Sequence, residues 1–291
     1  MALDLTVMAL TCLVLLAAGY GSVLTLMLFP KTRPGAAEAL AILHTEALIV
    51  VTAVAAVWLG GWVLAAALIA LALRVGHEAA SVAGGARFAG PLLAATVVAL
   101  ALLPLDLLLW PALAALALAW LAVSRPRSPA TAPQHVLTLA AFPGLPLVLF
   151  VAAGFQDLGA WLLAAFFLVE TFDSYALLGG KILGRTKAFP VLSPKKTVEG
   201  LAAGAVMLML TAALVGYLLF GAPVLASAGF ALYVGVLALA GDLAASRLKR
   251  QGGVKDYPPI LRLQGGLLDI TDAWIAAGAG VTALAVLAGW A

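Results

Sequence analysis

The chain has 291 residues, of which 65% are hydrophobic and only 10% are charged, and its mean hydropathy is +1.14. A soluble domain carries about 25% charged residues, so the composition excludes that class and predicts a polytopic membrane protein. The net charge of +3 is small. Anionic lipid headgroups account for a basic surplus beside a membrane, so we expect no nucleic acid partner.

Long apolar segments recur along the whole chain. About 20 apolar residues in a helix cross the hydrocarbon core of a bilayer, and a helix satisfies its own backbone hydrogen bonds there. The predicted spans are residues 5–29, 43–59, 62–74, 89–103, 105–124, 135–153, 158–180, 199–219, 222–246 and 272–290. The third and fourth are short and are expected to be tilted, half-buried or partly re-entrant. The predicted fold class is all-α: a polytopic membrane helix bundle of about ten transmembrane helices, with a cytoplasm-facing polar site in the C-terminal half.

The distribution of charge predicts the orientation of these spans. With ten alternating spans, all 16 Lys and Arg fall on one side, whereas Asp4, Asp106 and Asp157 fall on the other. Basic residues collect in cytoplasmic loops, so we expect a multi-pass protein of the cell (inner) membrane with the basic side in the cytoplasm. Tryptophans lie mostly near predicted span ends and are expected to form an aromatic belt. They are Trp58, Trp62, Trp110, Trp120, Trp161, Trp274 and Trp290.

Carboxylates inside apolar spans are costly and usually face a cavity or a partner. Two segments of the C-terminal half carry them beside Lys, Arg and Gly. The first runs from Glu170 and Asp173 through residues 179–200, and the second runs from Asp242 to Asp272. A structural salt bridge or a hydrogen bond between helices is the competing interpretation of Asp173 and Asp242.

This mixture of side chains suits a phosphorylated ligand bound together with a divalent cation. Mg²⁺ takes carboxylate oxygens together with substrate phosphates, while Lys and Arg neutralise the remaining phosphate charge. Asp269 and Asp272 are three residues apart and share one face of a helix. Glycines let backbone N–H groups approach a ligand closely; they are Gly252, Gly253, Gly265 and Gly266.

Two shorter patterns predict local structure. In "SPKKTVEG", Ser193 or Thr197 can cap a helix and Pro194 suits its first turn. His77 and Glu78 could form a metal pair, but adjacent residues point to different faces of a helix. A polar helix end is the favoured interpretation of His77 and Glu78.

The stretch from Gly241 to Asp272 resembles the signature of the phosphatidate cytidylyltransferase family, the CDP-diacylglycerol synthases. The family pattern is S-x-x-K-R-x4-K-D, then H-G-G, then D-R-x-D. The residues that match it at the same relative spacing are Ser246, Lys249, Arg250, Lys255, Asp256, Gly265, Gly266, Asp269 and Asp272. Residues 172–200, "FDSYALLGGKILGRTKAFPVLSPKKTVEG", resemble further blocks of that family. The resemblance covers about the last 130 residues, so residues 1–134 are interpreted as N-terminal transmembrane helices and 135–291 as the catalytic region.

The resemblance implies a Mg²⁺-dependent enzyme that converts CTP and phosphatidate into CDP-diacylglycerol and pyrophosphate, with either one cation or a second cation beside it. It also suggests a homodimer. The residues implied for metal binding are Asp173, Asp242, Asp269 and Asp272. Asp242, Asp269, Asp272, Lys249 and Lys255 are the implied catalytic residues. Those implied for substrate binding are Ser193, Lys195, Lys196, Thr197, Ser246, Arg250, Asp256, Arg262, Gly265 and Gly266.

The chain departs from the family pattern at Ala245, Arg262, Gln264 and Ile270. These positions usually hold an acid, Pro or Gly, His and Arg, respectively, so a divergent member that uses another lipid phosphate or nucleotide is an alternative. The alternative outside the enzymes is a membrane scaffold or a small-solute transporter. A scaffold predicts carboxylates paired with Lys and Arg and no bound metal. A transporter predicts charged, broken helices near the midplane.

Overall fold

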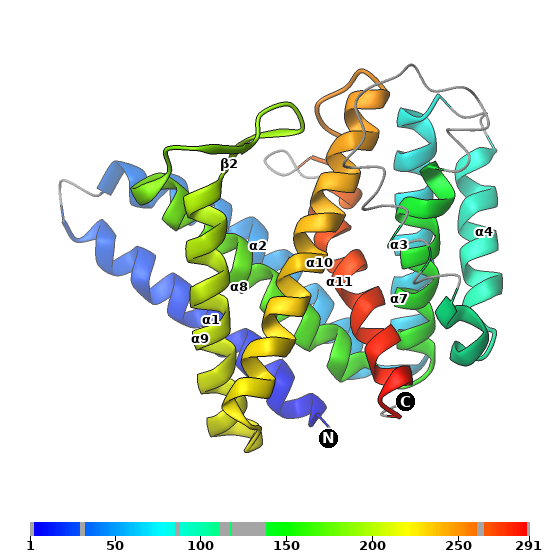
Figure 1. Cartoon of the computed structure of the whole chain (residues 1–291), viewed down its shortest axis with the longest axis horizontal. Coiled ribbons are helices and arrows are strands. Elements are labelled where there is room, and N and C mark those ends of the chain that lie inside the picture. Colours follow the sequence, from blue (N-terminus) through cyan, green and yellow to red (C-terminus); the bar gives the residue numbers. More distant parts are fainter. Residues whose placement is uncertain are drawn as a thin grey trace.

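A computed structural model describes residues 3–29, 33–84, 88–110, 114, 117, 138–260 and 265–289, which form a bundle of helices (Figure 1). The helices of the first half are α1 (Leu5–Met27), α2 (Arg33–Leu59), α3 (Gly61–Val82) and α4 (Ala89–Ala101). The second half contains the π-helical turn η1 (Ala140–Gly144) and the helices α7 (Leu145–Phe155), α8 (Gly159–Leu183), α9 (Val198–Phe220), α10 (Val224–Gln251) and α11 (Leu267–Leu287). Strands β1 (Lys187–Phe189) and β2 (Ser193–Thr197) form an antiparallel hairpin between α8 and α9.

The predicted all-α membrane bundle is confirmed. Among the described residues, six helices are long and apolar enough to cross a membrane, and shorter apolar helices cover 43–59, 89–101 and 140–155. The predicted spans match these helices in chain order, except that most of the fifth, residues 105–124, lies outside the described residues. The β1–β2 hairpin is an addition that the apolar pattern did not reveal, because its residues are polar and its strands are short.

Three helices that supply site residues extend five or more residues beyond their predicted ends, and α2 is longer as well, since it begins at Arg33 instead of residue 43. Helix α3 continues from the predicted end at residue 74 to Val82, and α10 continues from 246 to Gln251. Helix α11 begins at Leu267 instead of residue 272. In each case the extra turns carry charged or polar residues, which a hydrophobicity pattern assigns to loops. These turns bring Glu78, Lys249 and Asp269 into helices.

Helix α11 lies at the centre of the bundle, where it packs on α3, α7, α8 and α10. In its most apolar 18-residue window, 78% of the residues are buried, compared with 17% in α9. Small residues allow the close packing, since a Cβ at Gly278 would meet Phe150 at 2.5 Å. The hydroxyls of Thr271 and Thr282 donate to the carbonyls of Leu267 and Gly278, at 2.8 Å each, so neither is unsatisfied in the core.

The tryptophans divide between the surface and this core. Trp58, Trp62 and Trp110 are exposed, as expected of an aromatic belt. Trp161 and Trp274 are buried, so the belt prediction was wrong for them. The Trp274 ring contacts Phe150 and Phe166, and its Nε1–H donates to the carbonyl of Leu162 at 2.8 Å. Trp120 and Trp290 lie outside the described residues.

Polar segments gather at one end of the bundle. Figure 1 shows the β1–β2 hairpin and the end of α10 at the end opposite the two chain termini. The loop that follows α10 leads into α11 there. The C-terminal half therefore brings its two polar segments to the same end, although they are about 60 residues apart in the sequence.

Candidate active site

Asp173, Lys196 and Asp242 come together from α8, β2 and α10. The Lys196 ammonium lies 3.5 Å from Oδ1 of Asp173 and 3.0 Å from Oδ2 of Asp242. Asp272, from the first turns of α11, is close enough to both aspartates and to Lys196 to interact with them electrostatically. We call Asp173, Lys196, Asp242 and Asp272 the Lys196 cluster.

Lys196 remains a cation in this cluster. Burial alone would lower its pKa, but the negative charges of Asp242 and Asp173, with a smaller contribution from Asp272, outweigh burial and raise the pKa above its ordinary value. The lysine is therefore protonated throughout the physiological pH range.

The turn from α8 through the hairpin into α9 positions Lys196. Thr197 is the N-cap of α9, and its hydroxyl accepts the N–H of Gly200 at 3.2 Å, as the sequence predicted for a capping residue. The Glu199 carboxylate accepts the N–H groups of Arg185 and Thr186 at 3.0 and 3.1 Å. Pro194 lies in β2, so the prediction that it occupies the first helical turn was wrong. Lys196 is thus held one residue before a capped helix.

Glycines allow α8 and α9 to approach each other beside this turn. A Cβ at Gly200 would lie 2.7 Å from the carbonyl oxygen of Ala176 and 2.8 Å from the Cα of Gly180. A Cβ at Gly204 would meet the side chain of Ala176 at 2.8 Å. The Gly-Gly pair of α8 and the Gly after Glu199 therefore serve close helix packing.

Asp269 organises a second group of contacts, which we call the Asp269 network. Its Oδ1 pairs with Nζ of Lys249 at 2.5 Å, and its Oδ2 accepts the N–H groups of Tyr257 and Gly266 at 2.9 and 3.0 Å. Gly265 has φ of +81°, a conformation that favours glycine, and a Cβ there would lie 2.5 Å from the Asp269 carboxylate. The Gly-Gly pair is needed for the turn around Asp269.

Tyr257 completes the Asp269 network, and the sequence analysis missed it. Its side chain is buried, its hydroxyl donates to the carbonyl of Ala245 at 3.2 Å, and its ring lies 5.3 Å from Nζ of Lys249. Burial, followed by repulsion from Asp272, Asp269 and Glu78, raises the pKa of Tyr257, so the phenol stays neutral and can donate. The sequence feature that could have identified Tyr257 is its position as an aromatic residue in a loop otherwise rich in glycine, proline and charged residues.

Glu78 of α3 also reaches this region and was likewise missed as a member of the site. It is fully buried, pairs with Arg74 at 2.5 Å, and accepts the N–H groups of Leu267 and Leu268 at 2.9 and 2.7 Å. His77 is exposed, so the two adjacent side chains face different sides of α3, as predicted. The spacing of Arg74 and Glu78, four residues apart in a helix, was the signal that could have identified the pair.

Other predicted site residues lie around these two groups. Ser246 is buried in α10, Ser193 is half-buried in β2, and Lys195 is exposed beside Lys196. Arg250 donates to the carbonyl of Val254 at 3.0 Å. Lys255 and Asp256 are exposed in the loop after α10, and within the described part of the chain neither forms an ion pair with the aspartates. Arg262 and Gln264 lie outside the described residues.

The donor set suits a hard divalent cation in charge and chemistry, although the geometry is not preassembled. Among the described residues, no three His, Cys, Asp or Glu side chains converge closely enough to hold a metal ion. The carboxyl groups of Asp173, Asp242, Asp269 and Asp272 outnumber the amino groups of Lys196 and Lys249 by two. Oδ2 of Asp242 is buried and accepts no hydrogen bond of good geometry from the described residues, and Asp272 is buried without a Lys or Arg in ion-pair distance there. A divalent cation would take these carboxylate oxygens as ligands and neutralise their charge.

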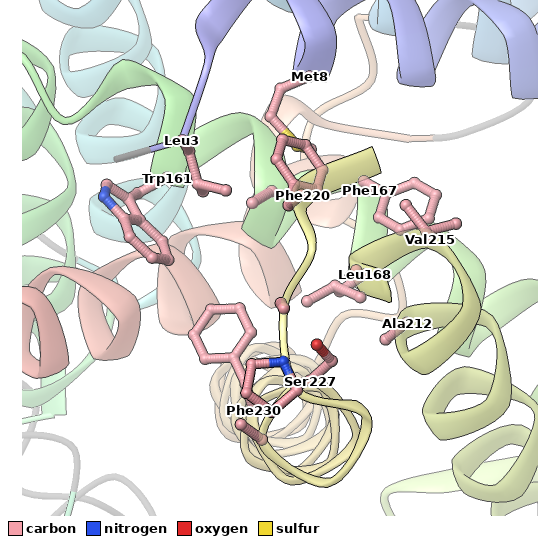
Figure 2. Close-up of a pocket in the computed structure, with 15 residues that line it drawn as sticks. Leu3, Met8, Trp161, Phe167, Leu168, Ala212, Val215, Phe220, Ser227 and Phe230 are labelled. Carbon is pink, nitrogen blue, oxygen red and sulfur yellow. The ribbon is translucent and has the colours of Figure 1, made fainter. Parts of the chain in front are cut away.

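An apolar cavity lies elsewhere in the bundle. It has a volume of about 200 Å³ and is lined by residues of α1, α8, α9 and α10, among them Met8, Phe167, Val215 and Phe230 (Figure 2). Phe230 precedes Asp242 by twelve residues of α10, or about 18 Å along the helix axis. The cavity is therefore separate from the Lys196 cluster.

Comparisons with known proteins identify the family of the chain. The profile of the Cytidylyltransferase family matches residues 40–288. The phosphatidate cytidylyltransferase of Staphylococcus aureus (strain COL) is 37% identical over 116 residues, which are 40% of this chain and 45% of that protein. The phosphatidate cytidylyltransferase of Helicobacter pylori (strain ATCC 700392 / 26695) is 36% identical over 134 residues, 45% of this chain and 49% of that protein. The uncharacterized protein YnbB of Escherichia coli (strain K12) is 39% identical over 108 residues, 37% of this chain and 36% of that protein.

The similarity to these curated relatives spans between about a third and a half of their length. The family profile, in contrast, extends over most of this chain, from α2 to the last turn of α11. The chain therefore belongs to the Cytidylyltransferase family.

Proposed function

We propose that the chain transfers the cytidylyl group of CTP to phosphatidate, with release of pyrophosphate and formation of CDP-diacylglycerol. The observation that carries this proposal is the Lys196 cluster, which joins family motifs from α8, β2, α10 and α11 at one end of the bundle. In the reaction, a phosphate oxygen of the lipid forms a bond to the α-phosphorus of CTP. The bond from that phosphorus to the bridging oxygen breaks, and pyrophosphate leaves with the electron pair.

The residues of the chain would position the reactants and neutralise their charge. Because the lipid phosphate is already an oxyanion, the reaction needs no nucleophile from the protein. Lys196 is held between Asp173 and Asp242, and Lys249 pairs with Asp269. Both lysines can turn toward phosphate oxygens. Lys195, Arg250, Lys255 and Arg262 would bind phosphates at the rim. Ser193, Thr197, Ser246 and Asp256 are proposed to support the substrate site through hydrogen bonds.

Mg²⁺ is the proposed cofactor. Asp173, Asp242, Asp269 and Asp272 would hold it, and when bound it would neutralise triphosphate charge and orient the CTP phosphates. The surplus of two carboxyl groups over Lys196 and Lys249 supports this proposal, since ion pairing alone, as in a scaffold, would leave some of these groups without a positive partner.

The glycine pattern predicted that backbone N–H groups near Gly265 and Gly266 approach a ligand, but these groups at the start of α11 bind side chains of the protein. The N–H of Gly266 donates to Asp269, and those of Leu267 and Leu268 donate to Glu78. These donors are occupied by carboxylates of the chain itself. We therefore propose that lysine and arginine side chains, rather than this helix N-terminus, contact the phosphates, and that Gly265 and Gly266 shape the turn.

The proposed setting is the cell (inner) membrane, with the site open to the cytoplasm for CTP and to the lipid for phosphatidate. The basic residues of the hairpin and of the end of α10 support this orientation by the positive-inside rule. A homodimer and a division of roles between residues 1–134 and 135–291 are further proposals. The mass of the detergent-solubilised protein tests the first, and separate expression of residues 135–291 tests the second.

Turnover of CTP by the purified protein in liposomes tests the function. We expect Mg²⁺-dependent release of pyrophosphate and formation of CDP-diacylglycerol from phosphatidate. Asp242→Asn should lower turnover at least 100-fold, since even residues that only orient metal ligands contribute about 10- to 100-fold. Asp242 is a sharper choice than Asp269, because Asp269 also holds two backbone N–H groups.

Other lipid phosphates in the same assay address the departures from the family pattern. If the protein turns over another lipid phosphate but not phosphatidate, the proposed substrate is wrong and the proposed class of reaction stands. CTP and Mg²⁺ that fail to bind, measured by calorimetry, would overturn the enzyme proposal and support a scaffold.

A further inference from the structure

The start of α11 is capped by a side chain from another helix. The N-cap position is Gly266, which has no side chain to accept the free N–H groups of the first turn. Glu78 of α3 supplies the acceptors instead: Oε1 lies 2.9 Å from the N of Leu267, and Oε2 lies 2.7 Å from the N of Leu268. The cap therefore couples the position of α11 to that of α3, about 190 residues earlier in the chain.

Arg74 holds the Glu78 carboxylate in place. Nε of Arg74 lies 2.5 Å from Oε1 of Glu78, and Nη2 donates to the carbonyl of Pro258 at 2.8 Å. The arginine thus joins α3 to the loop that carries Tyr257. A fully buried carboxylate is tolerated only when it is paired and hydrogen-bonded, and Glu78 has both kinds of partner. We call Arg74 and Glu78 the Glu78 clamp.

The fit around this clamp leaves little room for movement. A Cβ at Gly266 would lie 2.6 Å from Oε2 of Glu78 and 2.6 Å from the Cβ of Tyr257. Negative charge at a helix N-terminus is also favoured by the helix dipole. Within the first two turns of the same helix, Asp269 pairs with Lys249, and Asp272 belongs to the Lys196 cluster.

We propose that Glu78 and Arg74 are positioning residues for the cytidylyl transfer: they set the start of α11 and thereby the directions of the Asp269 and Asp272 carboxylates. The inference rests on the proposed function for its chemical consequence. It assigns a role in the site to an N-terminal helix whose residues carry none of the family motifs. Neither residue touches the substrates, since their charged groups are occupied by each other and by the backbone.

The test compares Glu78→Gln with Glu78→Asp and with the control Glu46→Gln in detergent-purified full-length protein. Glutamine keeps the size of the side chain, but its amide nitrogen cannot accept an N–H, so one α11 donor loses its acceptor and Arg74 loses its counter-charge. Glu46→Gln is a control for the loss of one carboxylate, since Glu46 lies in α2 and interacts electrostatically with Glu170 of α8. The two readouts are steady-state turnover of CTP and hydrogen exchange of peptides that cover residues 265–272.

We expect Glu78→Gln to lower kcat about 10- to 100-fold, the range found when a group that orients a metal ligand is removed. The KM for CTP should change less than about threefold, because the phosphate-binding lysines remain. Exchange in residues 265–272 should accelerate at least tenfold. Glu78→Asp retains the charge and should recover part of kcat, which a loss of packing alone would not allow.

The inference is overturned if Glu78→Gln matches Glu46→Gln in kcat per folded molecule, or if exchange at the start of α11 is unchanged. If Glu78→Gln does not fold, Arg74→Lys replaces it, since lysine can pair with Glu78 but cannot also reach Pro258 with a second fixed donor. Hydrogen exchange can be measured without substrate, so it tests the Glu78 clamp independently of the proposed cytidylyl transfer. Accelerated exchange with an inactive wild type rejects the proposed function and keeps the clamp; unchanged exchange with an active wild type rejects the clamp alone.

Discussion

Lys195 and Lys196 are neighbours in the chain but occupy different environments. The Lys196 side chain is 21% exposed and pairs with Asp173 and Asp242, whereas Lys195 points to the surface from the same strand. Adjacent residues of a strand face opposite sides, so the alternation in β2 decides which lysine enters the cluster. The sequence motif presents the two lysines as equivalent.

Removing each lysine separately tests this difference. Lys196→Gln should leave Asp173 and Asp242 without a counter-charge, lower turnover about 100-fold or more, and destabilise the protein by about 1–3 kcal/mol, between the values for exposed and buried pairs. Lys195→Gln should lower turnover less than tenfold, mainly through the KM for CTP, with no loss of stability. Turnover assays and thermal unfolding in detergent measure both. Equal effects of the two substitutions would contradict the assignment of Lys196 to the cluster.

Gly266 lies between the clamp and the Asp269 network. Its backbone is extended, so another residue could adopt the conformation, but a Cβ would collide with Glu78 and Tyr257. Glycine is therefore required at position 266 because there is no space for a Cβ atom, and not because of the backbone conformation.

Gly266→Ala should lower the free energy of unfolding by about 1–3 kcal/mol, the usual cost of overpacking, and should reduce turnover by displacing Asp269. The matched control is Gly229→Ala in α10, where no atom lies within 4 Å of a new Cβ. The control should gain about 0.5–1 kcal/mol from helix propensity. Thermal unfolding of both variants checks the prediction, and a Gly266→Ala protein as stable as wild type would refute the fit described here.

At the scale of elements, the hairpin and the three lengthened helices build the site. Thr197 is the N-cap of α9 and Gly221 is its C-cap, whose φ of +60° terminates the helix in a left-handed conformation. Thr197 is buried, and its hydroxyl also lies within 3.1 Å of the position of a Cβ at Gly180. The cap thereby fixes the point where the chain leaves the strand with Lys196.

Thr197→Val preserves the shape of the side chain and removes the cap. The protein should lose about 1 kcal/mol of stability, within the range of about 0.5–2 kcal/mol for an N-cap, and its turnover should fall because β2 is less constrained. Thr96→Val is the control, since the Thr96 hydroxyl donates to the carbonyl of Leu92 within its own helix, α4. Unfolding temperatures measured in one detergent allow the comparison; a smaller loss for Thr197→Val than for Thr96→Val would argue against the cap.

At the scale of the whole molecule, the bundle has a polar end and an end that carries both termini (Figure 1). The hairpin lies at the first end. The connection between α7 and α8, at Gln156 and Asp157, lies at the opposite end of α8. The proposed orientation places the hairpin in the cytoplasm and this connection outside.

Labelling with a membrane-impermeant thiol reagent tests that orientation. Cys12 is the single cysteine and is buried, so Cys12→Ser provides a background for Val191→Cys at the hairpin tip and Gln156→Cys at the connection. In spheroplasts, Gln156→Cys should react and Val191→Cys should react only after the membrane is opened. The reverse pattern would place the site outside and exclude cytosolic CTP as its substrate.

Particular residues show how far the sequence could be read. Asp173, Asp242, Asp269 and Asp272 were identified because a charge is unexpected within an apolar span, and the structure brings them to one end of the bundle. Glu78 was missed because the third span was predicted to end at residue 74. Tyr257 was missed because it is an uncharged residue in a loop, and the search was for charged residues. The Trp274 prediction failed because proximity to a span end does not distinguish a surface belt from a buried centre.

The sequence by itself determined the membrane class, the order of the spans and the family, because these depend on local hydrophobicity and on motifs of fixed spacing. Only the tertiary structure decided which lysine meets which aspartate, and that a glutamate of α3 caps α11. The physical reason is that these contacts join helices about 20 to 190 residues apart. Their pairing is set by side-chain packing and by the need to satisfy buried charge, neither of which a periodic apolar pattern records.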